Sequence, residues 1–320
     1  MTDARRSLVA SAPTRLDFGG GWTDVPPYPE ERGGRVCNIA ISRRATVRLT
    51  AVSVHDANAT TDRLVRAALE RAQAHGVNVS IESDFPLGAG LGGSSAAGVA
   101  LAAALHVHHG WSYSPSSLAE WSRAVEVDGM QIAGGRQDHY AAAYGGALDL
   151  TFAHDTLARS IAIPPATRVA LESRVLLAYT GESRMSATTI TAVLDAYRER
   201  VPRVVHALDT IARVAHEMCD ALRCGDVDGL AHLVDEQWRA QRLLHPAITT
   251  ARIDAIDHAA RIAGAHSLKA LGASGGGCVM VFAPLDAVDG VTAAIAPFST
   301  LLPWRIDDSG VVVHSVDDVA

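Results

Sequence analysis

A glycine-rich run that joins a predicted strand to a predicted helix constrains the fold of this chain more than any other feature. The run covers residues 86–97 and reads Pro-Leu-Gly-Ala-Gly-Leu-Gly-Gly-Ser-Ser-Ala-Ala. Glycine adopts positive φ without strain and lets the backbone approach a ligand closely. The first N–H groups of a helix have no partner within the helix and lie at the positive end of its dipole. The run therefore predicts a strand–loop–helix unit that binds phosphate.

The same glycines have other possible meanings. Gly88, Gly90 and Gly93 also fit the pattern G-x-G-x-x-G of dinucleotide-binding folds. That fold requires a second strand that ends in an acidic residue about 20 positions further on, whereas residues 114–117 begin another helix. A Walker A loop is excluded because the sequence contains no Gly-Lys-Ser or Gly-Lys-Thr. A simple glycine turn that caps an alanine-rich helix is the structural alternative.

Composition narrows the class of protein and its partners. The 320 residues suffice for about two domains, and 48% hydrophobic with 20% charged residues indicate a globular chain. The net charge of −7 argues against general nucleic-acid or anionic-membrane binding, so we expect neither as a partner. The four cysteines lack the spacing of a zinc site. No cleavable apolar core follows the polar residues 2–6, so we expect a cytoplasmic protein.

The pattern of predicted elements changes near residues 165–172. Strands and glycine-rich turns dominate before it, with strands expected at 5–12, 35–41, 45–54, 77–81, 145–152 and 157–163. Helices are expected there at 64–75, at 94–109, and from a capping box at 117–120 to about 128. Beyond it we expect a strand at 174–179, helices at 186–200, 201–223, 227–244 and 249–263, and short β-rich runs at 278–282 and 310–313. Because strands cluster rather than alternate strictly with helices, we expect two α+β domains, residues 1–168 and 169–320.

Two further glycine-containing segments form a pattern with residues 90–97. Residues 15–28 read Arg-Leu-Asp-Phe-Gly-Gly-Gly-Trp-Thr-Asp-Val-Pro-Pro-Tyr, and residues 268–278 read Leu-Lys-Ala-Leu-Gly-Ala-Ser-Gly-Gly-Gly-Cys. In this order the segments resemble the three motifs of the GHMP kinases, the galactokinase, homoserine kinase, mevalonate kinase and phosphomevalonate kinase superfamily. The resemblance covers essentially the whole chain. It implies a two-domain GHMP kinase fold of the α+β class, with a ribosomal-protein-S5-domain-2-like N-terminal domain and a C-terminal α/β sandwich of the ferredoxin-like type.

Other segments narrow the resemblance to sugar kinases. Residues 134–146 and 179–184 are similar to the branch that phosphorylates heptose 7-phosphate at its anomeric hydroxyl, whereas residues 20–27 are closer to the L-fucose kinase branch. The sequence departs from these patterns at Trp22, at His139 (usually glutamine) and at Ser274 (usually glycine). The resemblance implies an ATP-dependent kinase of a sugar or sugar phosphate, acting as a monomer or homodimer. Two alternatives stay open: a GHMP kinase for a non-sugar alcohol, such as a cyclitol, an amino acid or a mevalonate-like acid, and a non-catalytic ligand sensor.

The resemblance also implies roles for individual residues. It assigns the ATP phosphates to the loop Gly88, Ala89, Gly90, Leu91, Gly92, Gly93, Ser94 and Ser95. It assigns Mg²⁺ to Ser94 and to Glu126, which lies twelve positions before Asp138; such a sparse ligand set suits an ion that keeps phosphate and water as its other ligands. Asp138, in the turn 134–146, is the expected base, and Arg15 is the expected cation beside the reacting hydroxyl. The structural alternatives are a solvated Glu126, a turn-stabilising Asp138 and a surface Arg15 that closes a strand.

Substrate binding is assigned by the same resemblance to Arg15, Asp17, Gly21, Thr23, Asp24, Asp138, Gly275 and Gly276. The last two belong to the glycine run 272–277 of the second domain. Asp24 and Thr23 are expected to hydrogen-bond to sugar hydroxyls and so to orient the sugar. Leaving either of these hydrogen-bonding groups unpaired would cost binding free energy. A sugar phosphate would also need a cationic socket, for which the available residues are Arg35, Arg43, Arg44 and Arg184. No metal is expected at the histidines 106, 108 and 109, which end a helix without an acidic partner at matching spacing.

Overall fold

Two antiparallel sheets form the framework of the protein. The computed structural model describes residues 6–57, 60–130, 134–182 and 187–317. The larger sheet has six strands in the order β10-β1-β2-β4-β5, with β3 also paired to β2. Its strands are β1 (Arg6–Gly19), β2 (Gly34–Ala51), β3 (Val77–Ser83), β4 (Ala147–Phe152), β5 (Thr156–Ile161) and β10 (Val312–Asp317). The smaller sheet has four strands in the order β7-β8-β6-β9, namely β6 (Val175–Tyr179), β7 (Ser267–Ala270), β8 (Cys278–Phe282) and β9 (Thr300–Leu301).

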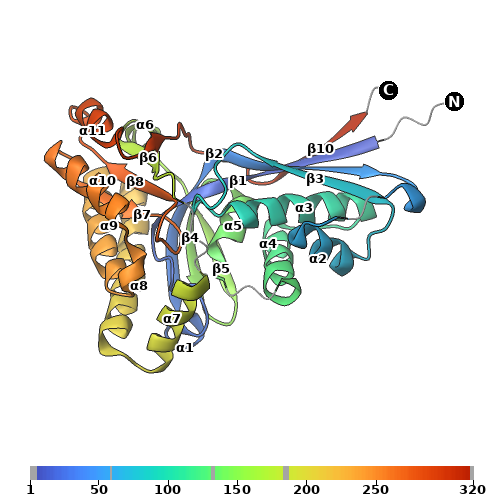
Figure 1. The fold of residues 1–320 in the computed structure, drawn as a ribbon, viewed down its shortest axis with the longest axis horizontal. Coiled ribbons are helices and arrows are strands. Elements are labelled where there is room, and N and C mark those ends of the chain that lie inside the picture. The colour runs from blue at the N-terminus through green and yellow to red at the C-terminus, as the bar shows by residue number, and fades with distance from the viewer. Residues whose placement is uncertain (1–5, 58–59, 131–133, 183–186, 318–320) are drawn as a thin grey trace.

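The helices fall into two groups by their order in the chain, before residue 165 and from residue 165 onward. The first group and its short 3₁₀ and π turns comprise α1 (Tyr28–Arg32), η1 (Val54–Asp56), α2 (Arg63–Ala72), α3 (Gly93–His109), α4 (Pro115–Ala124), η2 (Val125–Gly129) and α5 (Gln137–Tyr144). The second comprises α6 (Pro165–Arg174), α7 (Ala187–Arg198), α8 (Pro202–Cys224), α9 (Val227–Arg242), η3 (Pro246–Ile248), α10 (Ala251–Ile262) and α11 (Val288–Ile295). Figure 1 shows α2–α5 beneath the long strands β1–β3, and α8–α11 gathered at the opposite end with the smaller sheet.

Helix α3 is the centre of the first group. Its residues 95–106 are buried, which explains why the segment is so rich in alanine: small side chains let the helix pack closely on every side. At Gly98 an added Cβ would lie only 2.4 Å from Ser122 Oγ of α4, so the backbone of α3 lies directly against the Ser122 side chain. This packing fixes the N-terminus of α3, where the glycine run ends, relative to the large sheet.

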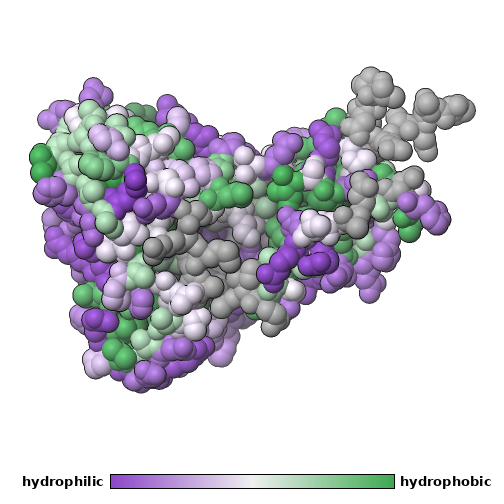
Figure 2. Space-filling model, viewed as in Figure 1, coloured by the Kyte–Doolittle hydropathy of each residue, from purple (hydrophilic) through white to green (hydrophobic). Residues whose placement is uncertain are grey.

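The two ends of the chain meet in one sheet. Strand β10 pairs with β1 in antiparallel register, from Arg6 opposite Asp317 to Ser11 opposite Val312, and Figure 1 shows the two strands side by side. A buried apolar cluster also connects the first part of the chain with the smaller sheet, where the rings of Phe18 and Phe282 lie 6.1 Å apart. In the space-filling view of Figure 2 the molecule has a broad lobe and a narrower one with an indentation between them.

Several expected elements differ in their limits. The runs expected at 35–41 and 45–54 form one strand, β2, because β1 pairs along nearly all of it while β4 and β3 pair with its two halves. The capping box lies at Ser114 and Ser117, so α4 begins at Pro115, two residues before the expected start. The pattern of predicted elements was expected to change near residues 165–172. In the structure, residues 165–174 form helix α6. Within the ranges described above, no helix is long and apolar enough to cross a membrane.

Candidate active site

The glycine loop adopts the backbone that its sequence predicts. Gly88, Gly90 and Gly92 have φ values of 71°, 73° and 77°, which residues with side chains rarely adopt. A Cβ atom at Gly90 would lie 2.7 Å from the carbonyl oxygen of Leu271, and one at Gly92 would lie 2.9 Å from Cγ of Asp138. Glycine is therefore needed both for the path of the loop and for its close contact with two other motifs.

Hydrogen bonds from the first and third motifs hold this loop in place. The backbone N–H of Arg15 in β1 donates to the carbonyl of Leu91 at 3.1 Å, and the N–H of Cys278 in β8 donates to the carbonyl of Ala89 at 2.7 Å. The Arg15 guanidinium donates through Nη1 to the carbonyl of Gly90 at 2.8 Å. The three motifs thus form one structural unit, although they are far apart in the sequence.

The N-terminus of α3 is not capped by a side chain. Its N-cap is Gly92, which makes no side-chain capping hydrogen bond. By contrast, α2 is capped by Asp62, whose carboxylate accepts from the N–H groups of Leu64 and Val65. The start of α3 therefore offers backbone donors and the positive end of the helix dipole to an external anion. A phosphate group matches this position in charge and in hydrogen-bonding capacity.

Glu126 lies beside the start of α3 on the π-helical turn η2. Ser94 Oγ donates to Oε1 of Glu126 at 2.6 Å, and Nε2 of His139 lies 3.2 Å from its Oε2. Burial raises the pKa of Glu126, but the electrostatic effect of His139 and hydrogen bonds from His139, Ser94 and Ser95 outweigh burial, so the pKa is lower than usual. An ionised carboxylate next to a serine hydroxyl provides hard oxygen ligands of the kind that Mg²⁺ prefers.

Arg15 and Asp138 form an ion pair at the centre of the site. Arg15 Nη2 lies 2.7 Å from Oδ1 of Asp138, and the arginine side chain is 2% exposed while that of the aspartate is 26% exposed. Asp138 was expected in an irregular turn, but it stands in the first turn of helix α5. The helix gives its carboxylate a fixed direction, with one side against the guanidinium and the other accessible to a ligand.

Asp24 holds the start of the helix that carries Asp138. Its Oδ2 accepts from the backbone N–H groups of Arg136 at 2.8 Å and Gln137 at 3.0 Å. Gly135 is necessary for this contact, since a Cβ there would lie 1.9 Å from the same oxygen. Burial raises the pKa of Asp24 to about 6, against the lowering effect of the two backbone hydrogen bonds. Asp24 therefore orients α5 in addition to any contact with a ligand.

Lys269 forms a buried ion pair with Asp17. It is the only lysine in the sequence, and its side chain is fully buried. Its Nζ donates to Oδ2 and to the backbone carbonyl of Asp17, both at 2.9 Å. Burial lowers the pKa of Lys269, and the negative charge of Asp17 opposes that effect. This pair connects β7 with β1, and Oδ1 of Asp17 stays buried without a hydrogen-bond partner among the described residues.

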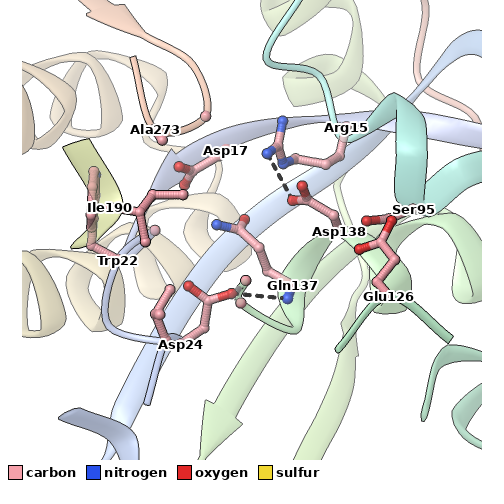
Figure 3. A pocket seen from close by; sticks show the side chains of 15 residues that line it. Arg15, Asp17, Trp22, Asp24, Ser95, Glu126, Gln137, Asp138, Ile190 and Ala273 are labelled. Carbon is pink, nitrogen blue, oxygen red and sulfur yellow. Dashed lines mark hydrogen bonds and ion pairs between the residues drawn. The ribbon is translucent and has the colours of Figure 1, made fainter. Parts of the chain in front are cut away.

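Two cavities meet at Asp138. The small cavity has a volume of about 170 Å³ and is lined by Arg15, Asp17, Gly21, Trp22, Asp24, Val25, Ser95, Glu126, Gly134, Gly135, Gln137, Asp138, Ile190, Gly272 and Ala273. The large cleft, of about 740 Å³, follows the glycine loop and also reaches Arg63, Ile81, Phe85 and Met130. Both are lined by Ser95, Glu126 and Asp138. Figure 3 shows Asp138 between the Ser95–Glu126 pair on one side and Asp17, Trp22 and Ile190 on the other.

Some residues assigned to the substrate lie outside the small cavity. Thr23 is fully buried, and its hydroxyl donates to the Gly20 carbonyl at 2.7 Å and accepts from a backbone N–H, which occupies it within the protein. Gly275 and Gly276 pack against neighbouring backbone instead of lining the cavity. The third motif reaches the cavity through Gly272 and Ala273.

Among the residues that line the small cavity and that sequence reasoning did not assign to the site are Gln137, Trp22 and Ile190. Gln137 and Trp22 lie within the motifs, and the signals available were a polar neighbour of Asp138 and an aromatic residue inside a glycine run. Trp22 also has a positive φ of 84°, so the backbone presents its ring in an unusual direction. Ile190 comes from α7, and nothing in the sequence marks it.

Of the arginines considered for a phosphate socket, Arg35, Arg43 and Arg44 do not line the small cavity. Arg35 and Arg44 are ion-paired with aspartates elsewhere, and Arg43 donates to backbone carbonyls. Arg184 lies outside the described residues. The side chains of the first three are therefore engaged with partners that do not line the small cavity.

Comparison with known proteins agrees with this geometry. Residues 59–146 match the family model "GHMP kinases N terminal domain". The bifunctional fucokinase/GDP-fucose pyrophosphorylase of Arabidopsis thaliana is 25% identical, covering 87% of this chain but 30% of that protein, so the chain spans less than a third of this relative. The D-glycero-alpha-D-manno-heptose 7-phosphate kinase of Campylobacter jejuni is 23% identical, covering 87% of this chain and 89% of that protein. A mevalonate kinase of Thermococcus onnurineus is 28% identical, with coverages of 79% and 73%.

A solved structure shows the fold. The D-glycero-D-manno-heptose 1-phosphate kinase from Bacteroides thetaiotaomicron superimposes with a TM-score of 0.76 at 20% identity, covering 98% of this chain and 100% of that one. This chain therefore has the GHMP kinase fold and carries a GHMP kinase N-terminal domain. The matching proteins are kinases, which confirms the expected enzyme class, a phosphotransferase with an alcohol as acceptor.

Proposed function

We propose that this protein transfers the γ-phosphoryl group of ATP to a hydroxyl of a sugar or sugar phosphate, with the anomeric hydroxyl as the expected acceptor. The observation that carries the proposal is the meeting of the two cavities at Ser95, Glu126 and Asp138. The large cleft contains the uncapped start of α3 and suits the nucleotide, and the small cavity suits the acceptor. The point of transfer then lies beside Asp138, where a carboxylate and a guanidinium are paired.

The residues of this site divide the chemistry between them. Asp138 accepts the proton of the acceptor hydroxyl while that oxygen forms a bond to the γ-phosphorus. The bond from the γ-phosphorus to the bridging oxygen breaks, and ADP leaves with that oxygen. Arg15 lies beside the reacting groups and stabilises the negative charge that develops there. The backbone N–H groups at the start of α3 hold the phosphates of ATP in position.

Mg²⁺ is part of the proposal, and its ligands would be Ser94 and Glu126. Their oxygens lie 2.6 Å apart, and Glu126 is kept ionised by its neighbours. Mg²⁺ commonly binds one or two protein oxygens and keeps phosphate and water as its other ligands. When bound, Mg²⁺ would supply positive charge to the phosphates.

The nature of the acceptor has two candidates. The heptose-phosphate kinase and fucokinase relatives support a sugar or sugar phosphate. The mevalonate kinase relatives match at similar identity and support a non-sugar alcohol as the second candidate. A non-catalytic sensor would not need Ser94, Glu126 and Asp138 together, so their arrangement around one point favours an enzyme. A cytoplasmic location and a monomeric or homodimeric state remain expectations.

ADP release tests the proposal. Purified protein with ATP and Mg²⁺ is assayed against sugars, sugar phosphates, cyclitols and mevalonate, with each product checked by mass spectrometry for one added phosphoryl group. We expect turnover with at least one sugar or sugar phosphate, and its loss in Asp138→Asn. Turnover with mevalonate or a cyclitol alone would select the second candidate, and no acceptor-dependent ADP release from folded protein would refute the enzyme.

A further inference from the structure

The small cavity has an apolar end. Trp22, Val25, Ile190 and Ala273 lie among its lining residues, and apart from the indole N–H their side chains carry no polar atoms. Figure 3 shows Trp22, Ile190 and Ala273 at the end remote from Ser95 and Glu126. A ligand that reaches from the point of transfer into the cavity therefore meets apolar surface at its far end.

Three residues that line the cavity carry buried polar atoms without partners among the described residues. Oδ1 of Asp17, Oε1 of Gln137 and Nε1 of Trp22 are buried and have no hydrogen-bond partner among the described residues. The Asp17 and Gln137 side chains converge on Gly21, where an added Cβ would lie 2.4 Å from Oδ2 of Asp17 and 2.8 Å from Nε2 of Gln137. Since buried polar atoms are normally paired, these atoms indicate where a ligand completes the hydrogen bonds. Two acceptors and one donor suit a set of hydroxyl groups.

Carboxylates outnumber cations around this space. Among the described residues that line it, the ionisable side chains are those of Asp17, Asp24, Glu126, Asp138 and a single cation, Arg15. Arg15 is paired with Asp138 at 2.7 Å, and Lys269 behind the wall is paired with Asp17 at 2.9 Å. A phosphate or carboxylate on the acceptor would be buried against like charges, with Arg15 and Lys269 already engaged.

From these three observations we infer that the acceptor is an uncharged sugar. It turns hydroxyls toward Asp17 and Gln137 and a less polar C–H face toward Trp22 and Ile190. The inference rests on the proposed function and narrows it, because a sugar phosphate and a mevalonate-like acid both carry an anion. Gln137 and Trp22 are then residues that determine specificity, through a hydrogen bond and an apolar contact respectively.

Binding without catalysis provides the first test. Isothermal titration calorimetry of the full-length protein compares matched pairs, each an uncharged aldose and its 6-phosphate, for example D-mannose with D-mannose 6-phosphate and D-galactose with D-galactose 6-phosphate, together with L-fucose, heptose 7-phosphate and mevalonate. We expect at least one uncharged sugar to bind at least tenfold more tightly than any phosphorylated or carboxylated ligand. Tighter binding of a phosphorylated ligand, including binding that disappears in Arg184→Ala, would overturn the inference.

A pair of variants at Ile190 tests the charge argument directly. Ile190→Lys adds a cation to the apolar wall, and Ile190→Gln adds a polar side chain of comparable length without charge. We expect the lysine variant to raise the ratio of kcat/KM for a phosphorylated sugar to that for its uncharged form at least tenfold, and the glutamine variant to leave it within about threefold. Equal effects of the two would overturn the inference.

Gln137 gives a test that does not depend on the Ile190 variants folding. Gln137→Leu keeps the approximate size and removes the amide, so affinity for the best uncharged sugar should fall at least about fivefold, the lower limit for leaving a buried partner unpaired. Affinity for ADP, which occupies the large cleft, should stay within about twofold. An unchanged sugar affinity would remove Gln137 from the binding site and overturn the inference.

The failures of the two proposals are distinguishable. If a phosphorylated or carboxylated acceptor is the best substrate, the inference that the acceptor is uncharged is refuted, and the proposed kinase activity is supported. If uncharged sugars bind but no acceptor is phosphorylated, the proposed kinase activity is refuted, and the inference that the small cavity binds an uncharged sugar is supported. If no sugar of either kind binds, both fail.

Discussion

The large cleft and the small cavity depend on different chemical groups of the chain, mainly backbone groups in the cleft and mainly ionisable side chains in the cavity. Along the cleft, the key features are backbone: three glycines with positive φ and an uncapped helix N-terminus. Around the cavity, they are buried ionisable side chains, with Arg15, Asp17 and Asp24 each at most 2% exposed. The positions of backbone donors are fixed by local conformation. The stability of buried charged side chains depends instead on partner residues that lie elsewhere in the sequence. The cleft should therefore be sensitive to added side-chain atoms, and the cavity to lost charges.

Asp138 is where the two regions meet, and its loss should have the largest effect. Asp138→Asn keeps the shape of the side chain and removes the proton acceptor. A positioned base contributes about 10²–10⁴-fold, so kcat should fall by at least about a hundredfold. KM or Kd for ATP should change little, because the phosphates are held by the loop and by α3. Steady-state kinetics and nucleotide titration measure both.

Melting temperature serves as the control for Asp138→Asn, since activity lost through unfolding says nothing about the base. A loose transition state needs little help from a base and predicts a smaller loss. A folded variant whose kcat stays within about tenfold of the wild type would show that Asp138 is not the base.

Lys269 tests the dependence of the cavity on distant partners. Lys269→Met leaves the buried Asp17 carboxylate without its cation, and removing one partner of a buried pair typically costs about 3–5 kcal/mol. Urea unfolding should show a loss of that size. The double variant Lys269→Met/Asp17→Asn removes the uncompensated charge and should recover at least half of it. A double variant no more stable than the single one would mean that the ion pair does not account for the loss.

Asp24 should make the cavity a source of pH-dependent instability. Its pKa is raised from 3.8 to about 6, so between these values the folded protein retains a proton that the unfolded chain has released. The contribution of Asp24 to stability is therefore fully present below about pH 4 and is lost as the pH rises through about 6. At about 1.4 kcal/mol for each pKa unit, the loss amounts to roughly 3 kcal/mol.

The test of the Asp24 prediction compares how the free energy of unfolding changes with pH in the wild type and in a variant. Free energies of unfolding from urea titrations at pH 4, 5, 6 and 7 are compared for wild type and Asp24→Asn, which cannot ionise. The variant should gain relative to the wild type as the pH rises, even if lost hydrogen bonds to α5 make it less stable at pH 4. Asp286→Asn, at an exposed position, is the control and should show no such trend. A gap between Asp24→Asn and wild type that does not change with pH contradicts the raised pKa.

The contrast between the regions also explains what could be predicted from the sequence. The strand, the glycine loop and helix α3 were predicted because turn glycines and alanine-rich periodicity are local signals. The structure also brings together Ser94 with Glu126 and Arg15 with Asp138, as the motif resemblance implied, although their roles stay predictions. The fold and the kinase class are confirmed.

The remaining features depend on contacts that no local pattern encodes. The ion pair of Asp17 and Lys269 joins two strands from opposite ends of the chain, and the return of β10 to pair with β1 is likewise a tertiary event. Ile190 enters the cavity from a helix of the second group. Thr23 was assigned to the substrate by its motif, yet its hydroxyl is occupied by backbone groups, a detail set by the exact path of the chain.

A matched pair of glycine substitutions tests the backbone side of the comparison, with the smallest expected effect. Gly90 and Gly110 have nearly equal φ values, 73° and 69°. A Cβ at Gly90 would lie 2.7 Å from the Leu271 carbonyl oxygen, whereas one at Gly110 would meet nothing within 4 Å. Both alanine variants carry the cost of a left-handed conformation, about 1–2 kcal/mol. The Gly90 variant must also move the loop away from the third motif.

Gly90→Ala should therefore raise KM for ATP severalfold to about tenfold beyond any change in Gly110→Ala, because a shift of the loop misplaces the phosphate donors at the start of α3. Affinity for the sugar, measured without nucleotide, should stay within about twofold in both variants, since the side chains proposed to bind the sugar, Asp17 and Gln137, are not part of the contact between Gly90 and Leu271. Equal changes of KM in the two variants would mean that backbone strain alone matters and that close contact between loop and third motif does not set the nucleotide site. A fall in sugar affinity confined to Gly90→Ala would show that the two regions are mechanically coupled, which contradicts their separation into a backbone-built cleft and a side-chain-built cavity.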